Sequence, residues 1–360
     1  MIYYTGLANQ TRQTAGAKAP SDILALCEKR NYRFIPLPPP NENLPKSILQ
    51  PWKYAQAVKF WNTILKTMQS GDVLVFQYPL YACRVLPQYI DRIHQKKIRM
   101  IVLIHDLETL RKGIAGAVEV NISAVENLEK ELLPKFDAVI CHNEKMKQHL
   151  LSVGYQADKV LCLEIFDYLS DAKVKVRTQK SSTPSIAVAG NLLKTKSGYI
   201  YHIHDDAHNE GLDVHLFGLS FDEECTNEKL KYHGSFPAGE LPEKLEGDFG
   251  LVWDGVSAET CAGNTGEYLR YNNPHKTSLY LSSGLPVIVW KQAAMADFVL
   301  KQQVGIAVNS LYELEDAVRS VTEEEYAAMC ENTRGIAEKL RNGYFFYKAQ
   351  DEGIAICESR

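Results

Sequence analysis

Short apolar runs alternate along the chain with longer segments whose apolar residues recur at helical spacing. In the first half the runs lie at 2–5, 33–37, 72–78, 98–104, 137–141 and 160–165, and helices are predicted near 20–30, 53–69, 83–95, 122–133 and 144–152. Runs such as VLVF and MIVLI are continuously apolar, as in parallel strands that are covered on both faces. This alternation predicts a doubly wound α/β sheet.

A second series of apolar runs follows and predicts a second α/β domain. These runs lie at 185–189, 214–217, 249–253, 286–289 and 305–308. The polar stretch LSDAKVKVRTQKSSTP (169–184) has few apolar anchors and is predicted to be the linker. The 360 residues are therefore interpreted as two domains, 1–170 and 184–342.

The C-terminal part predicts two further helices. One covers 322–341, where Thr322 and Glu325 have the spacing of a capping box. Asn342-Gly343 interrupts the pattern, which then resumes within 343–360. We expect this last helix to pack back on the first domain.

Composition and charge narrow the class of protein. Hydrophobic residues make up 45% and charged residues 23% of the chain, and the net charge of −4 gives no reason to expect a nucleic-acid partner. The eight cysteines are scattered, which favours reduced core thiols over a zinc site or disulfides. MIYYTGLANQ does not resemble a signal peptide, and no apolar run approaches the ~18 residues of a membrane span. A cytoplasmic protein is predicted, and association with the inner face of a membrane stays open.

The segment YNNPHKTSLYLSSGLPVIVW (271–290) places polar residues directly before a predicted helix. Free N–H groups at a helix N-terminus, with a lysine beside them, can bind an anion. Lys276 is therefore the candidate for contact with a diphosphate, and Asn272 and Asn273 can cap the helix or bond a ribose. The alternative is that Asn273 only caps the helix and Lys276 is solvated. Gly284 is expected to end the helix with a positive φ.

The long loop before this helix is a second candidate. Residues 254–273 follow a predicted strand and therefore lie at its carboxyl end, where ligands bind in open α/β sheets. Asp254 and Glu259 are candidates to bond sugar hydroxyls. The alternative is that Asp254-Gly255 forms only a turn.

Several segments resemble bacterial GT-B glycosyltransferases. The resemblance is narrower to the group that contains β-1,6-galactofuranosyltransferases and the glucosyltransferases that extend glycans on serine-rich adhesins. It spans nearly the whole chain in the same order. The segments are IHDLETLR (104–111), FDAVICHNEKM (136–146), IFDYL (165–169), GSFPAGELP (234–242), FGLVWDG (249–255) and GEYLRYNNPHKTSLYLSSGLPVIVW (266–290).

This resemblance implies two Rossmann-like domains that face each other across a cleft. The UDP-sugar would bind mainly to the second domain and the acceptor mainly to the first, with no metal or other cofactor required. The sequence has no Asp-x-Asp after a strand, which agrees with this. Lys276 matches the family lysine at the diphosphate, with Asn273 and His275 beside it.

Two further segments of the second domain are implied as donor contacts. In GNLLK, Gly190 and Asn191 allow the backbone to approach the ligand closely, and Lys194 can reach a phosphate. In GSFPAGELP, the backbone near Ser235 and Phe236 would hold the uracil.

In the first domain, the segment TRQTAGAKAPSD (11–22) follows the first strand and is rich in small residues. Such a loop can approach a diphosphate or a sugar closely, and Thr14 and Gly16 are its candidate contacts. The alternative is an ordinary strand-to-helix connection. It matches neither a Walker loop nor a dinucleotide fingerprint.

Polar residues also follow two strands of the first domain. An inverting transferase needs a base to take the acceptor proton, and Asp106 is the first candidate, with His105 or Glu108 as alternatives. The competing interpretation is that His105 and Asp106 brace the loop 106–119. His142 and Asn143 follow another strand and are candidates to line the acceptor site.

The stretch YHIHDDAH (201–208) brings three histidines and two aspartates together. On a helix His204 and His208 would share a face, as metal ligands can. The stretch lies in a predicted polar helix and lacks an HExxH pattern. A solvated surface is therefore the favoured interpretation, and no metal site is predicted.

The leading hypothesis is a hexosyltransferase that moves galactofuranose or glucose from a UDP-sugar to a glycan hydroxyl with inversion. The acceptor would be a glycan, glycolipid or glycoprotein, and a homo-oligomer stays open. A UDP-sugar 2-epimerase on the same architecture is the first alternative. A non-catalytic subunit of a partner transferase is the second, and the presence of Lys276 disfavours it.

Overall fold

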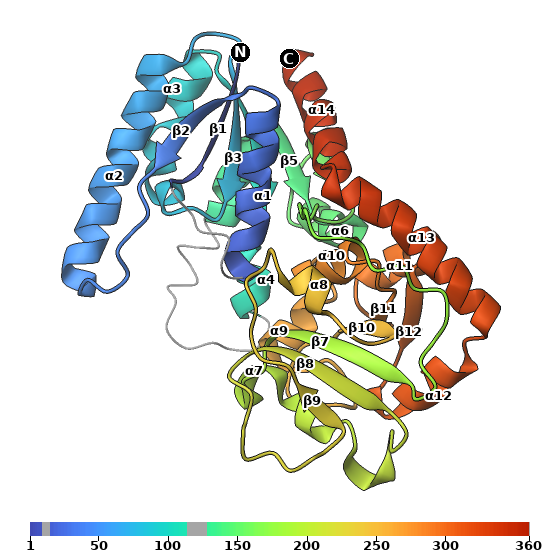
Figure 1. Cartoon of the computed structure of the whole chain (residues 1–360). Coiled ribbons are helices and arrows are strands. Elements are labelled where there is room, and N and C mark those ends of the chain that lie inside the picture. Colours follow the sequence, from blue (N-terminus) through green and yellow to red (C-terminus); the bar gives the residue numbers. More distant parts are fainter. Residues whose placement is uncertain (9–14, 114–127, 360) are drawn as a thin grey trace. The chain divides into compact units, whose positions relative to one another are not determined.

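The structure is a computed structural model that describes residues 1–8, 15–113 and 128–359 (Figure 1). The chain divides into two compact units. The first contains Gly16–Leu163, the strand that precedes it in sequence, and the C-terminal residues from Phe346 onward. The second contains Glu164–Phe345.

The first unit is built on a six-stranded sheet in the order β2-β1-β3-β4-β5-β6. Its strands are β1 (Ile2–Leu7), β2 (Arg33–Leu37), β3 (Val73–Tyr78), β4 (Arg99–Ile104), β5 (Ala138–Cys141) and β6 (Val160–Cys162). Its α-helices are α1 (Ala15–Lys29), α2 (Lys46–Thr67), α3 (Ile90–Gln95), α4 (Glu108–Gly113), α6 (Glu144–Ser152) and most of α14 (Tyr344–Glu358).

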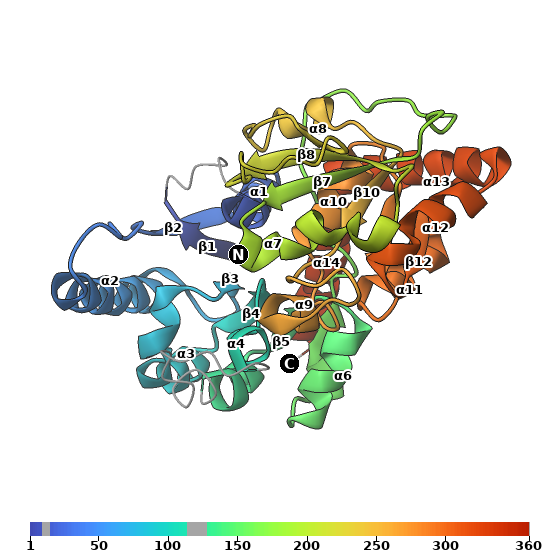
Figure 2. The same cartoon turned by 90° about the horizontal axis from the view of Figure 1, so that it is seen from below.

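The second unit repeats the architecture with a sheet in the order β12-β11-β10-β7-β8-β9. Its strands are β7 (Ser185–Asn191), β8 (Asp213–Leu219), β9 (Leu230–Tyr232), β10 (Phe249–Val252), β11 (Val287–Trp290) and β12 (Gly305–Val308). Its α-helices are α7 (Lys194–Ser197), α8 (Leu241–Lys244), α9 (Gly263–Tyr268), α10 (His275–Ser282), α11 (Met295–Gln302), α12 (Leu314–Ser320) and α13 (Glu323–Arg341). Figure 2 shows β7 and β8 side by side in this sheet.

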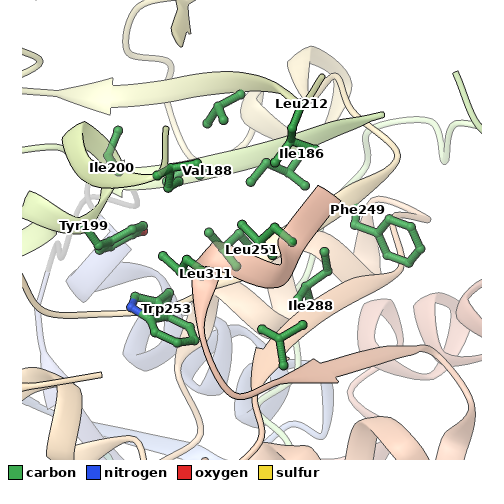
Figure 3. Packing of buried hydrophobic residues seen from close by; sticks show 14 of the residues in the cluster. Ile186, Val188, Tyr199, Ile200, Leu212, Phe249, Leu251, Trp253, Ile288 and Leu311 are labelled. Atoms are coloured by element: carbon green, nitrogen blue, oxygen red, sulfur yellow. The ribbon is translucent and has the colours of Figure 1, made fainter. Parts of the chain in front are cut away.

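Both sheets are parallel throughout the described residues, as the continuously apolar runs predict. Alternate residues of one strand enter different hydrophobic clusters on the two faces of the second sheet. Ile186 and Val188 of β7 belong to one cluster, and Ala187 and Ala189 belong to the other. Figure 3 shows Leu251 and Trp253 packed with other members of the first cluster. The predicted α/β fold with two Rossmann-like units is confirmed.

Several element predictions need correction. The helix predicted near 83–95 is a 3-10 helix, Tyr81–Gln88, followed by α3, because Pro87 lacks the N–H that an α-helix needs there. Helix α2 begins seven residues earlier than predicted and contains Pro51. Strand β9 was not predicted, since LKY is short and polar. The helix predicted near 122–133 falls mostly outside the described residues.

The polar stretch 169–184, which is predicted to be the linker, belongs to the second unit and is attached to it by basic side chains. Arg177 donates to the carbonyls of Ser283 and Leu245, and Lys175 also donates to Leu245 O. Long basic side chains can cover apolar surface while their charged ends bond to carbonyl oxygens. The stretch therefore packs without apolar anchors of its own.

The C-terminal helices have the local signals that the sequence predicts. Thr322 and Glu325 form the predicted capping box at the start of α13. Helix α14 follows, and a Cβ added at Gly353 would lie 3.2 Å from the Ile101 Cδ1 atom of β4, so the helix lies close against the first sheet (Figure 1). Within the described residues, the structure contains no helix with the length and apolar character needed to cross a membrane.

Candidate functional site

The strand order of the second sheet identifies a topological switch point. The chain runs from β7 to β8 and β9 on one side and then returns to place β10 on the other side of β7. In open parallel sheets, ligands bind outside the carboxyl ends of the strands at such a point. The residues that follow β7 and β10 are therefore the first place to look for a site.

Helix α10 packs so closely on this sheet that its register is fixed. A Cβ added at Gly250 of β10 would lie 2.2 Å from Tyr280 Cγ, so only glycine permits the approach. The Tyr280 hydroxyl accepts a hydrogen bond of 2.7 Å from Ala189 N of β7. Lys276 lies one helical turn before Tyr280, which brings it to the carboxyl edge of the sheet.

Lys276 is anchored at the switch point by two contacts. Its Nζ atom donates to Trp253 O and to Asp254 Oδ1, both at 2.8 Å. The side chains of Lys276 and Asp254 are only 18% and 13% exposed. Burial disfavours the charged ammonium, but the Asp254 carboxylate more than offsets this, so the pKa of Lys276 is above its ordinary value. Lys276 therefore stays charged, and the alternative of a solvated side chain is wrong.

The end of β7 passes directly beside this ammonium group. Gly190 has a φ of 138°, and a Cβ placed there would lie 3.7 Å from Lys276 Cε. Its backbone conformation strongly favours glycine. The backbone of Gly190, which has no side chain, therefore lies beside the Lys276 ammonium group at the carboxyl edge of the second sheet.

The asparagines before α10 do not cap it. The cap residue is Pro274, without a side-chain cap, while Asn273 is buried and donates to Glu164 O at 3.0 Å. The capping interpretation of Asn273 is therefore wrong. The Asn272 Oδ1 atom is buried and has no hydrogen-bond partner among the described residues.

The first turns of α10 hold the segment that enters the second unit. The Ser278 hydroxyl donates to Phe166 O at 2.6 Å, and the His275 ring centroid lies 5.1 Å from that of Tyr168. His275 precedes Lys276 in sequence, but the contacts described for its ring are with Phe166 and Tyr168. Gly284, with a φ of 73°, ends the helix as predicted.

The loop 254–273 is structured and contains α9. Gly255 N donates to Lys196 O at 3.2 Å, and a Cβ at Gly255 would lie 2.4 Å from Ala262 O, so the turn after Asp254 is compact. Asp254 forms that turn and also pairs with Lys276. Glu259 is exposed.

The other predicted donor contacts lie in separate surroundings. The Asn191 Oδ1 atom accepts from Leu193 N at 3.0 Å and shapes the turn into α7. Lys194 is 61% exposed and pairs with Asp222. Neither side chain is bonded to Lys276 or Asp254.

Ser235 and Phe236 follow β9. Ser235 is exposed, whereas Phe236 is half-buried against the second hydrophobic cluster, with its ring centroid 6.4 Å from that of Phe217. The ammonium of Lys244 lies 5.8 Å from the Phe236 ring centroid. The backbone near Ser235 thus lies beside an aromatic side chain that is already packed.

In the first unit, polar side chains meet at the carboxyl edge of β3, β4 and β5. His105 Nε2 lies 2.7 Å from Gln77 Oε1, and Gln77 Nε2 donates to Thr5 O at 3.2 Å. His142 is buried, hydrogen-bonds to the backbone of Ile104 and His105, and has its pKa lowered to about 4, chiefly by burial. Gln77 thereby spans β1 and β3, the switch point of this sheet.

The buried carboxylate of Glu129 holds the loop after β4 through hydrogen bonds. Glu129 accepts hydrogen bonds from Glu108 N at 2.7 Å, from Thr109 N at 3.2 Å and from the Tyr78 hydroxyl at 2.9 Å. Burial raises the pKa of Glu129. Asp106 is half-buried, and its Oδ2 atom lies 4.0 Å from Arg111 Nε.

The remaining predicted positions in the first unit are as follows. Asn143 caps α6, where its side chain accepts from Met146 N at 3.0 Å. Thr14 lies outside the described residues. Gly16 lies in α1, so the predicted loop 11–22 ends by residue 15, where helical structure begins. An alanine-rich stretch favours a helix there despite its glycine and proline.

The histidines of YHIHDDAH do not converge. The predicted helix is replaced by two 3-10 turns, Gly198–His202 and Asp205–Ala207. His204 Nε2 lies 3.0 Å from Leu212 O, and the ring of His208 stacks on Tyr312 with 4.5 Å between centroids. A shared face for His204 and His208 is therefore wrong.

Comparison with known proteins identifies the family. Residues 1–165 match the N-terminal domain, and residues 186–352 the C-terminal domain, of the family described as glucosyltransferase 3-like. The β-1,6-galactofuranosyltransferase WbbI of Escherichia coli (strain K12) is 35% identical over 364 residues, which cover 100% of both chains. The chain belongs to the glucosyltransferase 3-like family. It is an enzyme of the glycosyltransferase class.

A further relative and two solved structures are similar. Glucosyltransferase 3 of Streptococcus gordonii is 28% identical over 81% of both chains. The apo form of the lipopolysaccharide outer core galactosyltransferase WaaB has a TM-score of 0.60 at 10% identity, over 97% of this chain and 98% of that chain. Anabaena HepE in complex with UDP-glucose has a TM-score of 0.54 at 12% identity, over 99% and 98%. Both likenesses agree with a GT-B fold for this glycosyltransferase.

Three residues of the candidate sites were not predicted. Gln77 had a visible signal, because it is a polar residue near the end of the apolar run VLVFQY. Glu129 had none, since its partners are 20 to 51 residues away in sequence. The Tyr199 hydroxyl is buried without a hydrogen-bond partner among the described residues, and its pKa is raised by burial and then by the charge of Asp254. Tyr199 thus lies near the Lys276–Asp254 pair in the second unit.

Proposed function

We propose that the enzyme transfers a hexosyl group from a UDP-sugar to a hydroxyl group of a glycan, with inversion and without a metal ion in the reaction. The observation that carries this proposal is the largely covered Lys276–Asp254 pair at the switch point of the second sheet. Two of the three ammonium N–H groups of Lys276 are used, by Trp253 O and Asp254, and the third remains for a diphosphate oxygen.

In the proposed reaction, the acceptor oxygen bonds to the anomeric carbon as the bond from that carbon to the diphosphate oxygen breaks. The electron pair of the broken bond leaves with UDP, and the acceptor proton passes to a base, for which Asp106 is our candidate. Lys276 and the N–H groups at the start of α10 stabilise the charge that develops on the leaving diphosphate. A fixed cation of this kind supplies the role that a metal ion has in other transferases.

We propose galactofuranose as the first donor sugar to test and glucose as the second. The support is that WbbI, named a β-1,6-galactofuranosyltransferase, is 35% identical over the full length, whereas a relative named glucosyltransferase 3 is 28% identical over 81%. The acceptor would be a glycan, glycolipid or glycoprotein. Transfer assays with UDP-galactofuranose and UDP-glucose on a glycan acceptor decide between the donors.

The decisive variant is Lys276→Ala. We expect transfer to fall at least about tenfold and UDP affinity to weaken, because the diphosphate loses its fixed cation. Lys301→Ala is the matched control, since Lys301 is an exposed lysine in the last turn of α11 of the same unit. UDP affinity is measured by calorimetry, and activity by UDP release in the presence of acceptor.

The single variant leaves the Asp254 carboxylate without its cation, which can harm folding. The double variant Lys276→Met with Asp254→Asn removes both charges and keeps the side-chain sizes similar. We expect this folded double variant to bind UDP as weakly as Lys276→Ala does. Wild-type UDP affinity in either variant would contradict the proposed site.

A further inference from the structure

The second unit contains a cluster of metal-ligating side chains that the motif YHIHDDAH does not include. His215 lies in β8, His233 directly follows β9, and Glu246 follows α8. One ligand atom from each residue lies within 4.8 Å of the other two. His215 Nδ1 is 2.9 Å from His233 Nε2 and 3.6 Å from Glu246 Oε2.

The sheet holds the two imidazole rings in place. β8 and β9 are adjacent parallel strands, and His233 N donates to Leu216 O at 2.9 Å, which continues their pairing. The His233 ring stacks on Phe217, with 4.7 Å between centroids and an angle of 8° between planes. A site whose ligands are fixed by packing loses little conformational entropy when a ligand binds.

The third residue, Glu246, provides an adjustable ligand on a fixed backbone. The next residue, Gly247, has a φ of 123°, and a Cβ there would lie 2.9 Å from Ala187 N of β7. This close approach ties the turn to the central strand. The Glu246 side chain is 55% exposed and can rotate toward the imidazoles at little cost.

We propose that His215, His233 and Glu246 bind a zinc ion. Two imidazole nitrogens and one carboxylate oxygen are a donor set that zinc uses, and a water molecule would complete a tetrahedron. With zinc–ligand distances of about 2.0–2.1 Å, neighbouring ligands of a tetrahedron are about 3.3 Å apart. The observed 2.9 and 3.6 Å lie on either side of this value.

The site would join three parts of the second unit that are distant in sequence. Zinc would link β8 to the start of HGSFP and to the turn before Asp248. The Asp248 carboxylate in turn accepts hydrogen bonds from Ser181 N, before β7, and from Ser185 N at the start of β7. Bound zinc would thereby stabilise the backbone around 233–248, and this inference does not depend on the proposed transfer reaction.

The test measures zinc binding by the full-length chain after treatment with EDTA and removal of the chelator. Calorimetric titration with zinc should show one site, and zinc should raise the melting temperature by mass action. Glu246→Gln keeps the size of an exposed side chain and should weaken zinc binding at least about tenfold. His215→Gln should do the same, and circular dichroism checks that both variants fold.

The matched control is His202→Gln. His202 Nδ1 lies 2.7 Å from Asp205 Oδ2, so it is a histidine–carboxylate pair in the same unit, but no third ligand joins it within the part of the chain described. Its zinc affinity should equal that of the wild type. Equal zinc affinity in wild type, Glu246→Gln and His215→Gln, or an equal loss in His202→Gln, would overturn the assignment.

Discussion

His142 follows β5 with 1% of its surface exposed, and burial lowers its pKa from 6.5 to about 4. The unfolded chain therefore binds more protons at this residue than the folded chain does between these two values. The contribution of the neutral His142 to the free energy of unfolding is fully present above the unfolded pKa. It is lost as the pH falls from about 6.5 toward 4. At about pH 5 the expected loss, relative to about pH 7, is about 2 kcal/mol.

Chemical denaturation of wild type and His142→Gln at these two pH values measures this contribution. The variant should lose about 2 kcal/mol less on acidification, because glutamine does not titrate. Carboxylates also titrate in this range, so the result is the difference between the two proteins. His94→Gln is the control, since His94 is exposed, and it should behave like the wild type. Equal losses in His142→Gln and wild type would contradict the buried neutral imidazole.

At the residue scale, a position or role could be predicted only where the residues that determine it lie close together in sequence. The position of Lys276 in the first turn of a helix could be predicted, because a cation beside a helix start is visible within five residues of sequence. The role of Asn273 could not, because its partner, Glu164 O, lies 109 residues away. The same holds for His215, His233 and Glu246, because these residues are distant in sequence and come together only in the folded second unit.

At the scale of elements, helix α10 carries Lys276 and also binds the segment at the start of the second unit through Ser278. Ser278 and Ser282 are both buried on this helix, but their bonds differ. Ser278 donates to Phe166 O at 2.6 Å, whereas Ser282 donates to Leu279 O within its own helix. Removal of Ser278 Oγ therefore removes a hydrogen bond that joins α10 to another segment.

We therefore expect Ser278→Ala to lower the free energy of unfolding by about 1–2 kcal/mol. Ser282→Ala is the matched control and should cost less than about half of that, because a bond back to the preceding turn adds little to a helix. Urea denaturation of both variants measures the two values. A cost for Ser282→Ala as large as that for Ser278→Ala would show that the bond to Phe166 does not fasten the segment.

Strands were easier to predict than helices. A run such as MIVLI is apolar on both faces, which is typical of a covered parallel strand, and β2 and β12 have the predicted bounds. Among the helices, α6 has the predicted bounds. The predicted bounds of the helix near 53–69 and the predicted type of the helix near 83–95 were wrong. Each segment contains a proline, Pro51 in α2 and Pro87 in the 3-10 helix, and the sequence alone does not show whether a helix continues through it. Strand β9 could not be predicted, because a strand of three residues is too short to show the alternation of apolar and polar positions.

On the scale of the molecule, the chain leaves the first unit after Leu163 and returns to it at Phe346. The return occurs inside α14, which begins at Tyr344. Nothing in the pattern YFFYKAQ marks this point, because the helical periodicity continues through it. Two adjacent phenylalanines, Phe345 and Phe346, therefore belong to different units, although both are buried on one helix.

This pair provides a test of whether the units unfold separately. Phe345 lies in a hydrophobic cluster of the second unit, 6.0 Å from Phe298 between ring centroids, whereas Phe346 is counted with the first unit. Truncation of a buried phenylalanine costs about 3–5 kcal/mol. Phe346→Ala should therefore speed amide hydrogen exchange in β3 and β4, and Phe345→Ala should speed it in β10 and β11.

Each variant is the control for the other, because position in sequence, residue type and helix are the same. Hydrogen exchange followed by mass spectrometry reports the two sheets from separate peptides in one experiment. Faster exchange in both sheets from either substitution would mean that the molecule opens as one cooperative unit. Faster exchange confined to one sheet per variant requires that the stability of each sheet be set within its own unit, so that α14 stabilises the first sheet through Phe346 and the second through Phe345.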